Sequence, residues 1–287
     1  MTHSTRWRRV SRSEPCPVCH RPDWCLITGS PGSPSAAICP RTPSDRQVGE
    51  AGWLHVLRAR SADQHRRRPT FSHTPGPRCT EELAAMAEGW RLPTDSPRLA
   101  ALAQHLGVSV ESLSRLGAGW SAEHTAWVFP MRSASGQVLG VRLRLRDGRK
   151  LAVRGGHEGL FIPDGLQPGD RLLVCEGPSD VGAVLDLGFN AIGRPSCTGG
   201  VGHCVALARR LRPTALVVIA DADEPGQRGA ERLAAKLRLY CRDIRIITPP
   251  PPHKDVRDWY RAGATAADVE QAIAAAPAWA LTTTFNL

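Results

Sequence analysis

The sequence lacks any hydrophobic run long enough to cross a membrane. No stretch of its 287 residues approaches the roughly 18 apolar residues that a transmembrane helix needs. The N-terminus carries arginines but no apolar segment after them, so a secretory signal peptide is not predicted either. We therefore expect a cytoplasmic protein with no membrane partner.

Lysine is scarce, because only three of the 37 basic side chains are lysines and the others are arginines. The formal net charge is nevertheless +10, and residues 1–70 carry twelve arginines against five acidic residues. A surplus of this sign favours association with a polyanion such as nucleic acid, and it does not bear on the fold.

A disulfide framework is not indicated. The nine cysteines are an odd number in a chain without a predicted signal, which favours a reducing compartment. Four of them fall in one short segment rich in proline and glycine. This segment has too few apolar residues to fold without a stabilising cross-link such as a bound metal ion. Thiolates at such spacings can share one tetrahedral ion. We predict a structural Zn²⁺ held by Cys16, Cys19, Cys25 and Cys39, with His20 as an alternative ligand.

Tryptophan is the commonest aromatic residue, and two tryptophans belong to this cysteine-rich segment. We expect Trp24 and Trp53 to fill its small core. The alternative is that they stack on the bases of a single-stranded template.

Composition and apolar periodicity divide the rest of the chain into a linker and a series of predicted helices and strands. Polar, proline-broken residues 59–80 indicate a linker. Apolar periodicity predicts helices over 81–90, 96–106 and 108–116, and then a strand hairpin over 127–131 and 138–146. Strands at 171–175, 190–193, 215–220 and 243–247 alternate with helices at about 179–187, 201–211 and 226–239. This order predicts an α/β chain with a mostly parallel sheet covered on both faces.

Alternating residues mark the second strand of the hairpin. Arg142, Arg144 and Arg146 are predicted on one face and apolar residues on the other. A half-buried strand with a solvated face accounts for this pattern, and so does a basic strip that binds a nucleic-acid backbone. Both interpretations remain open at this point.

Carboxylates follow two apolar strands about forty-five residues apart. Glu176 and Asp180 follow the first strand, and Asp221 and Asp223 follow the second. Because open α/β sheets bind ligands at the carboxyl ends of their strands, we expect these four side chains in one cleft. Such a cluster needs a cation, and hard oxygen ligands suit Mg²⁺ or Mn²⁺. Helix capping would explain Asp180 but not the others.

The pattern Glu-Gly-x-x-Asp after one strand and Asp-x-Asp-x-x-Gly after another resembles the Toprim domain of primases, topoisomerases and certain nucleases. The resemblance implies that Glu176 lies nearest the chemistry, that Asp221 and Asp223 bind catalytic divalent metal, and that Asp180 is accessory. The stretch from His253 to Gly263 resembles a later primase motif. It implies that Asp255 joins the magnesium cluster and Lys254 the phosphate-binding groups, while Asp258 caps or orients the next helix.

A second stretch resembles primases of the bacterial DnaG type and phage primase-helicases. Val128-Phe-Pro-Met-Arg132, followed by Gly136, Gly140 and Arg144, is similar to a basic primase segment that contacts template or incoming nucleotide. The resemblance gives this role to Arg132, Arg144 and Lys150. Arg142 lies where the family has glycine, and we expect it to bind nucleic acid or nucleotide as well. The implied domains are a zinc-binding module (1–58), a linker (59–80), a primase-like α+β subdomain (81–168), a Toprim domain (169–265) and a tail (266–287).

The leading hypothesis is a DNA primase-like nucleotidyltransferase that makes short primers on single-stranded DNA from nucleoside triphosphates by two-metal phosphoryl transfer. No Walker A loop occurs, so a replicative helicase would be a separate partner. A metal-dependent Toprim nuclease and a non-catalytic DNA-binding replication adaptor are the alternatives. A topoisomerase is disfavoured, because neither Tyr240 nor Tyr260 lies in an evident nucleophile setting.

Overall fold

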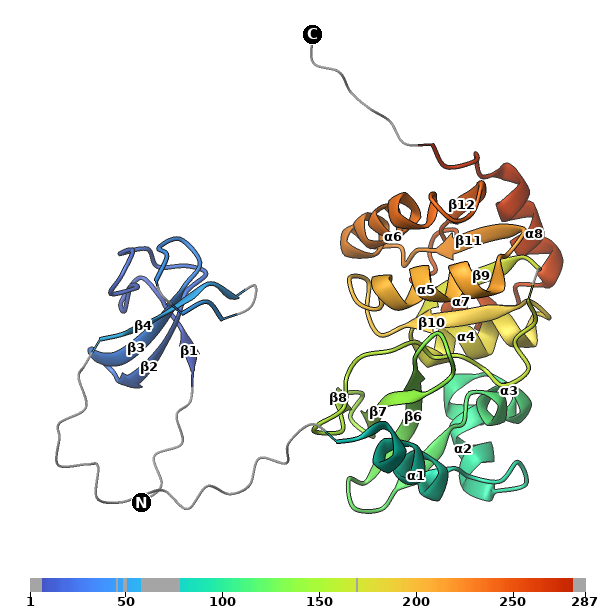
Figure 1. Ribbon diagram of the computed structural model, residues 1–287, viewed down its shortest axis with the longest axis horizontal. Coiled ribbons are helices and arrows are strands. Elements are labelled where there is room, and N and C mark those ends of the chain that lie inside the picture. Colours follow the sequence, from blue (N-terminus) through green and yellow to red (C-terminus); the bar gives the residue numbers. More distant parts are fainter. Residues whose placement is uncertain (1–6, 45, 49–50, 58–77, 169, 281–287) are drawn as a thin grey trace, which may run out of the picture. The chain divides into compact units, whose positions relative to one another are not determined.

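The computed structural model describes residues 7–44, 46–48, 51–57, 78–168 and 170–280 (Figure 1). The chain divides into two compact units, Met1–Ser72 and His73–Leu287. Most of the predicted linker, residues 58–77, lies outside the described residues. None of the described helices is long and apolar enough to span a membrane.

The first unit is a small antiparallel sheet of four strands in the order β1-β2-β3-β4. Its buried core includes three cysteines, Cys16, Cys25 and Cys39, together with Ile27 and a few small apolar side chains. These short strands were not predicted from the sequence. Their bounds are β1 (Arg8–Arg9), β2 (Leu26–Ser30), β3 (Ser33–Cys39) and β4 (Trp53–Val56).

The second unit begins with three helices and an antiparallel sheet in the order β5-β6-β7-β8. The strands are β5 (Gly119–Ser121), β6 (Ala126–Arg132), β7 (Val138–Leu145) and β8 (Lys150–Ala152). The helices, α1 (Thr80–Trp90), α2 (Pro97–Leu106) and α3 (Val110–Arg115), begin and end within a few residues of their predicted bounds. In β7 the predicted alternation holds, since Val141 and Leu143 are buried while Arg142 and Arg144 are half-buried.

A second sheet follows, and all its strands are parallel, in the order β10-β9-β11-β12. Its strands are β9 (Leu172–Glu176), β10 (Ala191–Arg194), β11 (Ala215–Ile219) and β12 (Asp243–Ile247). The helices are α4 (Gly177–Asp186), α5 (Val201–Leu211), α6 (Glu224–Leu237), α7 (Val256–Arg261) and α8 (Ala266–Ala275). Helix α8 lies in the segment expected to be a tail, where Val269 and Ile273 are buried in the core.

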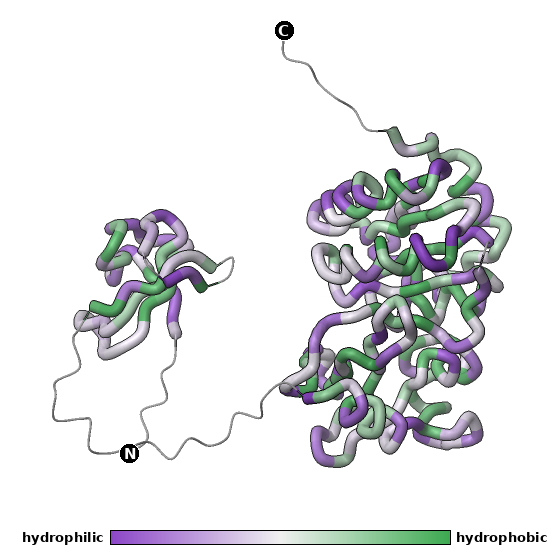
Figure 2. Tube along the Cα trace, viewed as in Figure 1, coloured by the Kyte–Doolittle hydropathy of each residue, from purple (hydrophilic) through white to green (hydrophobic). Residues whose placement is uncertain are grey.

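Side chains of the parallel strands alternate between two cores. On β9, Leu173 and Cys175 join the core with α4, α7 and α8, whereas Leu172 and Val174 join the core with α5 and α6. The sheet is therefore covered on both faces, as predicted, and its strands appear as hydrophobic segments in Figure 2. The mixed α/β class with a four-stranded parallel sheet and an N-terminal cysteine cluster is confirmed.

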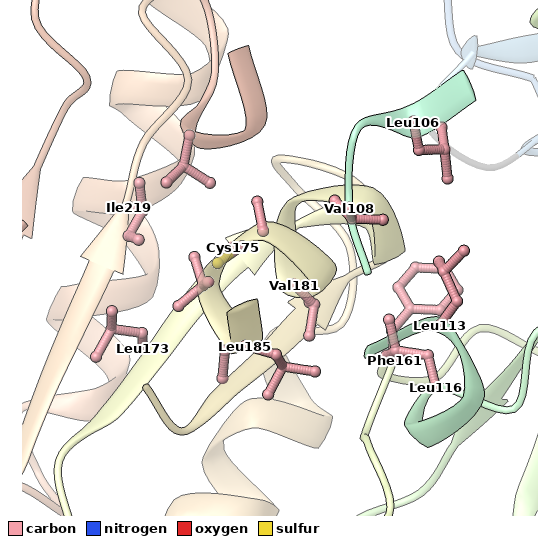
Figure 3. Close-up of a cluster of buried hydrophobic side chains, with 14 of the residues drawn as sticks. Leu106, Val108, Leu113, Leu116, Phe161, Leu173, Cys175, Val181, Leu185 and Ile219 are labelled. Carbon is pink, nitrogen blue, oxygen red and sulfur yellow. The ribbon is translucent and has the colours of Figure 1, made fainter. Parts of the chain in front are cut away.

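One of these cores joins the two halves of the second unit. Figure 3 shows Val181 and Leu185 of α4 between Leu173 of β9 and the side chains Val108 and Leu113 from the helical segment before β5. Phe129 and Met131 of β6 belong to the same cluster. The antiparallel and parallel sheets are thus held in one packed body.

Candidate functional site

Two neighbouring strand ends of the parallel sheet bring acidic residues together. Strands β9 and β11 are paired in parallel, so Glu176 at the end of β9 and Asp221 just after β11 lie at the same edge. Both side chains line a cavity of about 480 Å³. Asp180 from α4 and Asp255, just before α7, line the same cavity. Four of the five predicted acidic residues are therefore gathered at one place.

Asp180 is the most deeply placed of these carboxylates. It lies in the first turn of α4, which starts immediately after Glu176, and only 8% of it is exposed. Its Oδ1 atom is buried without a hydrogen-bond partner. Burial, and next the negative charges of Asp255 and Asp221, raise the pKa of Asp180 well above its ordinary value.

The pKa values of the neighbouring carboxylates, Asp221 and Glu176, are raised as well. Burial, followed by repulsion from Glu176 and Asp255, raises the pKa of Asp221 to about 6. Burial also raises the pKa of Glu176, although the positive charge of Arg194 opposes this effect. Ionised carboxylates crowded in this way are stabilised by a cation.

The donor set of the cavity fits a hard divalent ion. It consists of carboxylate oxygens, and both Glu176 Oε1 and Asp180 Oδ1 are buried without hydrogen-bond partners. Among the described residues, however, only four cysteines place three or more ligand atoms within 4.8 Å of one another. Mg²⁺ binds one or two carboxylates and completes its shell with water and substrate phosphates, so it does not require all the acidic side chains to converge on one point.

Asp223 is the exception among the predicted acidic residues. It is exposed, is not among the residues lining the cavity, and caps α6 by accepting a hydrogen bond of 2.8 Å from the backbone N–H of Gly226. Its charge still contributes to the raised pKa of Glu176 and of Asp221. Asp223 therefore lies at the rim of the acidic group.

The expectation that helix capping would explain Asp180 was wrong. Helix α4 has no side-chain cap, so capping does not explain Asp180. Asp255 is the N-cap of α7 and accepts a hydrogen bond of 2.7 Å from the backbone N–H of Asp258. Asp258 in turn accepts one from the backbone N–H of Lys254, which fixes the turn before the helix. Asp255 thus both caps α7 and lines the cavity, whereas Asp223 caps α6 outside it.

Cationic side chains line the same cavity. They are Arg142, Arg144 and Lys150 of the antiparallel sheet, and Lys254 and Arg257 beside α7. Arg132, the remaining predicted basic residue, does not line this cavity. It lines a separate cavity of about 200 Å³ beside α1 and lies 3.9 Å from Asp164. The structure therefore brings together four of the five predicted basic residues.

Arg194 was missed by the sequence analysis. It is paired with Glu176 in the register of β9 and β10, is 0% exposed, and places Nη2 3.7 Å from Glu176 Oε1. Its Nη1 donates to the carbonyl of Cys197 at 2.8 Å, while Nε and Nη2 have no hydrogen-bond partner. Because the pair depends on strand register and not on sequence spacing, no motif pointed to it.

The predicted zinc ligands form the tightest cluster. Sulfur atoms of Cys16, Cys19, Cys25 and Cys39 all lie within 4.8 Å of one another. The Cys19–Cys25 and Cys25–Cys39 distances are 3.6 and 3.9 Å, close to the edge of about 3.8 Å in a tetrahedron with 2.3 Å Zn–S bonds. His20 is outside the cluster. The donor set and its spacing fit Zn²⁺ bound by four thiolates.

The expectation that two tryptophans fill the core of this unit was wrong. Trp24 is 72% exposed, and Trp53 on β4 is half-buried but does not belong to the buried cluster. The reason is that the cysteines themselves, with Val10, Ile27 and Ala37, occupy the small interior.

Several solved structures that resemble this chain are primases. A DnaG primase catalytic domain bound to ssDNA matches with a TM-score of 0.55 and 18% identity, over 69% of this chain and 78% of that chain. The chain has a DnaG-type primase fold. The Escherichia coli primase catalytic core matches with a TM-score of 0.53 and 19% identity, over 69% of this chain and 80% of that chain. The Aquifex aeolicus primase, with zinc-binding and RNA polymerase domains, matches with a TM-score of 0.52 and 12% identity, over 70% of this chain and 62% of that chain.

At these identities the likeness establishes the primase fold and not the roles of individual residues. No protein-family model matches the sequence, and no curated protein matches it either. The assignment of chemistry therefore depends on the geometry of the primase fold in this chain, above all on its acidic cavity.

Proposed function

We propose that this protein is a DNA primase-like nucleotidyltransferase of the Toprim type, which makes short primers on single-stranded DNA. The observation that carries the proposal is one cavity lined both by Glu176, Asp180, Asp221 and Asp255 and by several arginines and lysines. Acidic and cationic side chains in one cavity suit a reaction in which phosphates and divalent ions meet.

The acidic residues would hold the ions. Asp180, Asp221 and Asp255 offer carboxylate oxygens to Mg²⁺ or Mn²⁺, and Asp223 adds negative charge at the rim. Bound divalent ions would lower the pKa of an attacking 3′-hydroxyl and offset the charge on a pyrophosphate leaving group. Glu176 would be held beside the reacting atoms by the buried charge of Arg194.

The cationic residues would bind phosphates. Arg144 and Lys150 face the cavity from paired positions on β7 and β8, and Lys254 faces it from the segment before α7. Charged donors in these positions can orient a triphosphate or the template backbone. The primase fold, together with a structural neighbour that is a DnaG primase catalytic domain bound to ssDNA, supports a single-stranded template. A separate replicative helicase stays part of the proposal.

A primer-synthesis assay tests the proposal. The full chain, with Mg²⁺ or Mn²⁺, nucleoside triphosphates and single-stranded DNA, should yield short oligonucleotides. Asp221→Ala should reduce the yield by at least ~100-fold, a size typical of losing an electrostatic group at a reacting centre. Glu82→Gln, which changes an exposed carboxylate on α1, is the matched control and should keep native activity.

The same assay separates the alternatives. Degradation of the DNA without synthesis, abolished by Asp221→Ala, would assign the site to a nuclease. Salt-sensitive DNA binding with no product of either kind, unchanged in Asp221→Ala and Glu176→Ala, would leave a DNA-binding adaptor.

A further inference from the structure

Four side chains line up across the antiparallel sheet of the second unit. Lys150 on β8 is paired with Arg144 on β7, Arg144 with Trp127 on β6, and Trp127 with Trp120 on β5. Directly paired residues on neighbouring strands point to the same face of a sheet. These four side chains therefore form one continuous row, called here the cross-sheet row.

The row connects the acidic cavity with the far edge of the sheet. Arg144 and Lys150 line the cavity, whereas Trp120 lies on the edge strand β5. With strands spaced about 4.8 Å apart, the row extends roughly 14 Å, the length of about four nucleotides at the rise of a stacked strand. A nucleic-acid strand that leaves the cavity along this face would meet the two tryptophans.

Two arginines flank the outer tryptophan. The guanidinium carbons of Arg98, on α2, and Arg146, after β7, lie 4.8 and 5.9 Å from the centre of the Trp120 ring. Both arginines are exposed, and neither takes part in the ion pairs found in the described part of the chain. Cations without acidic partners, set beside an aromatic ring, are the combination that binds phosphates and bases of single strands.

Core packing does not explain the whole row. The opposite face of the same sheet carries the apolar residues Val128, Val141 and Leu143, which form a buried core with α1. On the face of the row, Trp127 packs partly against the central core, and its ring meets Trp120 edge-on at 4.9 Å. Trp120 itself belongs to no buried cluster among the described residues and stays half-buried. The row is thus anchored at Trp127 and accessible at Trp120.

We propose that the cross-sheet row, together with Arg98 and Arg146, is a binding track for single-stranded nucleic acid. A base stacks on Trp120 in place of one of the guanidinium groups that lie over its ring, and these groups contact the phosphates. The proposal rests on the proposed function only for the direction of the strand, which runs toward the acidic cavity. It assigns the residues that hold the template outside that cavity.

The test measures binding by the full zinc-loaded chain without nucleotides or added divalent ions, so it does not depend on primer synthesis. The probes are a labelled oligo-dT of about 20 nucleotides, longer than the roughly 4–16 nucleotides of typical single-strand sites, and an abasic strand of equal length. Trp120→Leu should weaken oligo-dT binding about 5- to 150-fold, the range for one base stack, and leave abasic binding unchanged. Trp120→Phe should retain most of the affinity.

Two results would overturn the track. Native affinity of Trp120→Leu for oligo-dT would remove the stacking role. An equal loss for oligo-dT and the abasic strand, with Trp120→Phe no better than Trp120→Leu, would reduce Trp120 to a structural residue. Circular dichroism and thermal melting identify any variant that fails to fold. If Trp120→Leu does not fold, equal affinity of the native chain for oligo-dT and the abasic strand would overturn the stacking role.

Salt dependence tests the arginines separately. Arg98→Ala should lower the slope of log affinity against log salt by about 0.7, the value for one phosphate contact on a single strand. Arg232→Ala, which removes an exposed arginine from α6, is the matched control and should leave the slope unchanged. Equal slopes for native, Arg98→Ala and Arg232→Ala would contradict a phosphate contact at Arg98.

Discussion

At the scale of single residues, the acidic cavity is a place where the free protein is under electrostatic stress. Asp180, Asp221 and Glu176 all have raised pKa values because burial and mutual repulsion disfavour their charged forms. The buried guanidinium of Arg194 relieves this stress for Glu176 only. Crowded carboxylates of this kind lower the free energy of unfolding of the metal-free protein and favour the binding of cations.

The pKa of Asp221 gives a prediction for stability. Between its ordinary 3.8 and the folded value of about 6, the folded protein keeps a proton that the unfolded chain releases. The free energy of unfolding therefore falls as pH rises through this window and stays reduced above it. Without divalent ions, Asp221→Asn should be more stable than the native chain at pH 7, by about 1–2 kcal/mol after allowance for partial exposure.

Urea unfolding at pH 4 and pH 7 measures this difference. The gain of Asp221→Asn should shrink toward pH 4, and millimolar Mg²⁺ should raise the stability of the native chain more than that of the variant. A variant less stable than the native chain at both pH values would show that Asp221 is not destabilised by its neighbours.

Several of these residues could be predicted from the sequence, because a carboxylate after a buried parallel strand must lie at the carboxyl edge of the sheet. This reasoning places Glu176 and Asp221 correctly. It could not find Arg194, whose partner is eighteen residues away and reached only through strand register. Nor could it separate Asp223 from Asp221, because the direction of each side chain depends on where α6 begins.

At the scale of elements, close approaches of backbone hold the acidic strand ends against the helices. A Cβ atom at Gly226 would lie 2.7 Å from the carbonyl oxygen of Asp221, and one at Gly193 would lie 2.7 Å from that of Gly177. Glycine at both positions lets the starts of α6 and α4 approach the sheet edge. The same two glycines therefore help to position both the helix starts and the carboxylates at the strand ends.

Asp223 allows its capping role and its charge to be tested apart. Asp223→Ala should lower the free energy of unfolding by about 0.5–2 kcal/mol, because α6 loses its N-cap. Asp223→Asn keeps an oxygen acceptor for the Gly226 N–H and should leave stability nearly unchanged. If the charge at the rim assists the ions, both variants should lower primer synthesis.

Chemical denaturation and the primer assay, each at saturating Mg²⁺, provide the two readouts. Native activity in Asp223→Asn would limit this residue to capping. Native stability in Asp223→Ala would instead show that the cap contributes nothing to α6.

Helices and strands with clear apolar periodicity were predicted well, and short elements were not. The segments that became β9, β11, α5 and α6 carry runs or faces of apolar residues, and each was expected within about three residues of its place. The strands of the first unit are short and only partly buried, and β8 is short and exposed, so they have little pattern to detect. They form because neighbouring strands pair with them.

At the scale of the whole molecule, the two units depend on different sources of stability. The second unit has three apolar clusters, whereas the interior of the first is made largely of cysteines. An interior of this kind needs its metal, since binding energy of a structural Zn²⁺ is also folding energy.

Loss of zinc should therefore unfold the first unit and spare the second. Cys25→Ser, or treatment with a chelator, is expected to abolish hydrogen-exchange protection in residues 7–57 and to leave that of residues 78–280 unchanged. Metal analysis should give one zinc per native chain. Cys79→Ser, at an exposed cysteine outside the cluster, is the control and should keep both zinc and protection. Full protection of the first unit in metal-free protein would contradict the prediction.

The shared core behind the acidic cavity has a consequence for product release. The acidic lining residues come from the parallel sheet and its helices, whereas Arg142, Arg144 and Lys150 come from β7 and β8. One close-packed cluster joins β6, the strand paired with β7, to the parallel sheet, so the two sheets should keep their separation. If the protein makes primers as proposed, a lengthening duplex would have to leave the cavity by sliding, without a movement of one sheet away from the other.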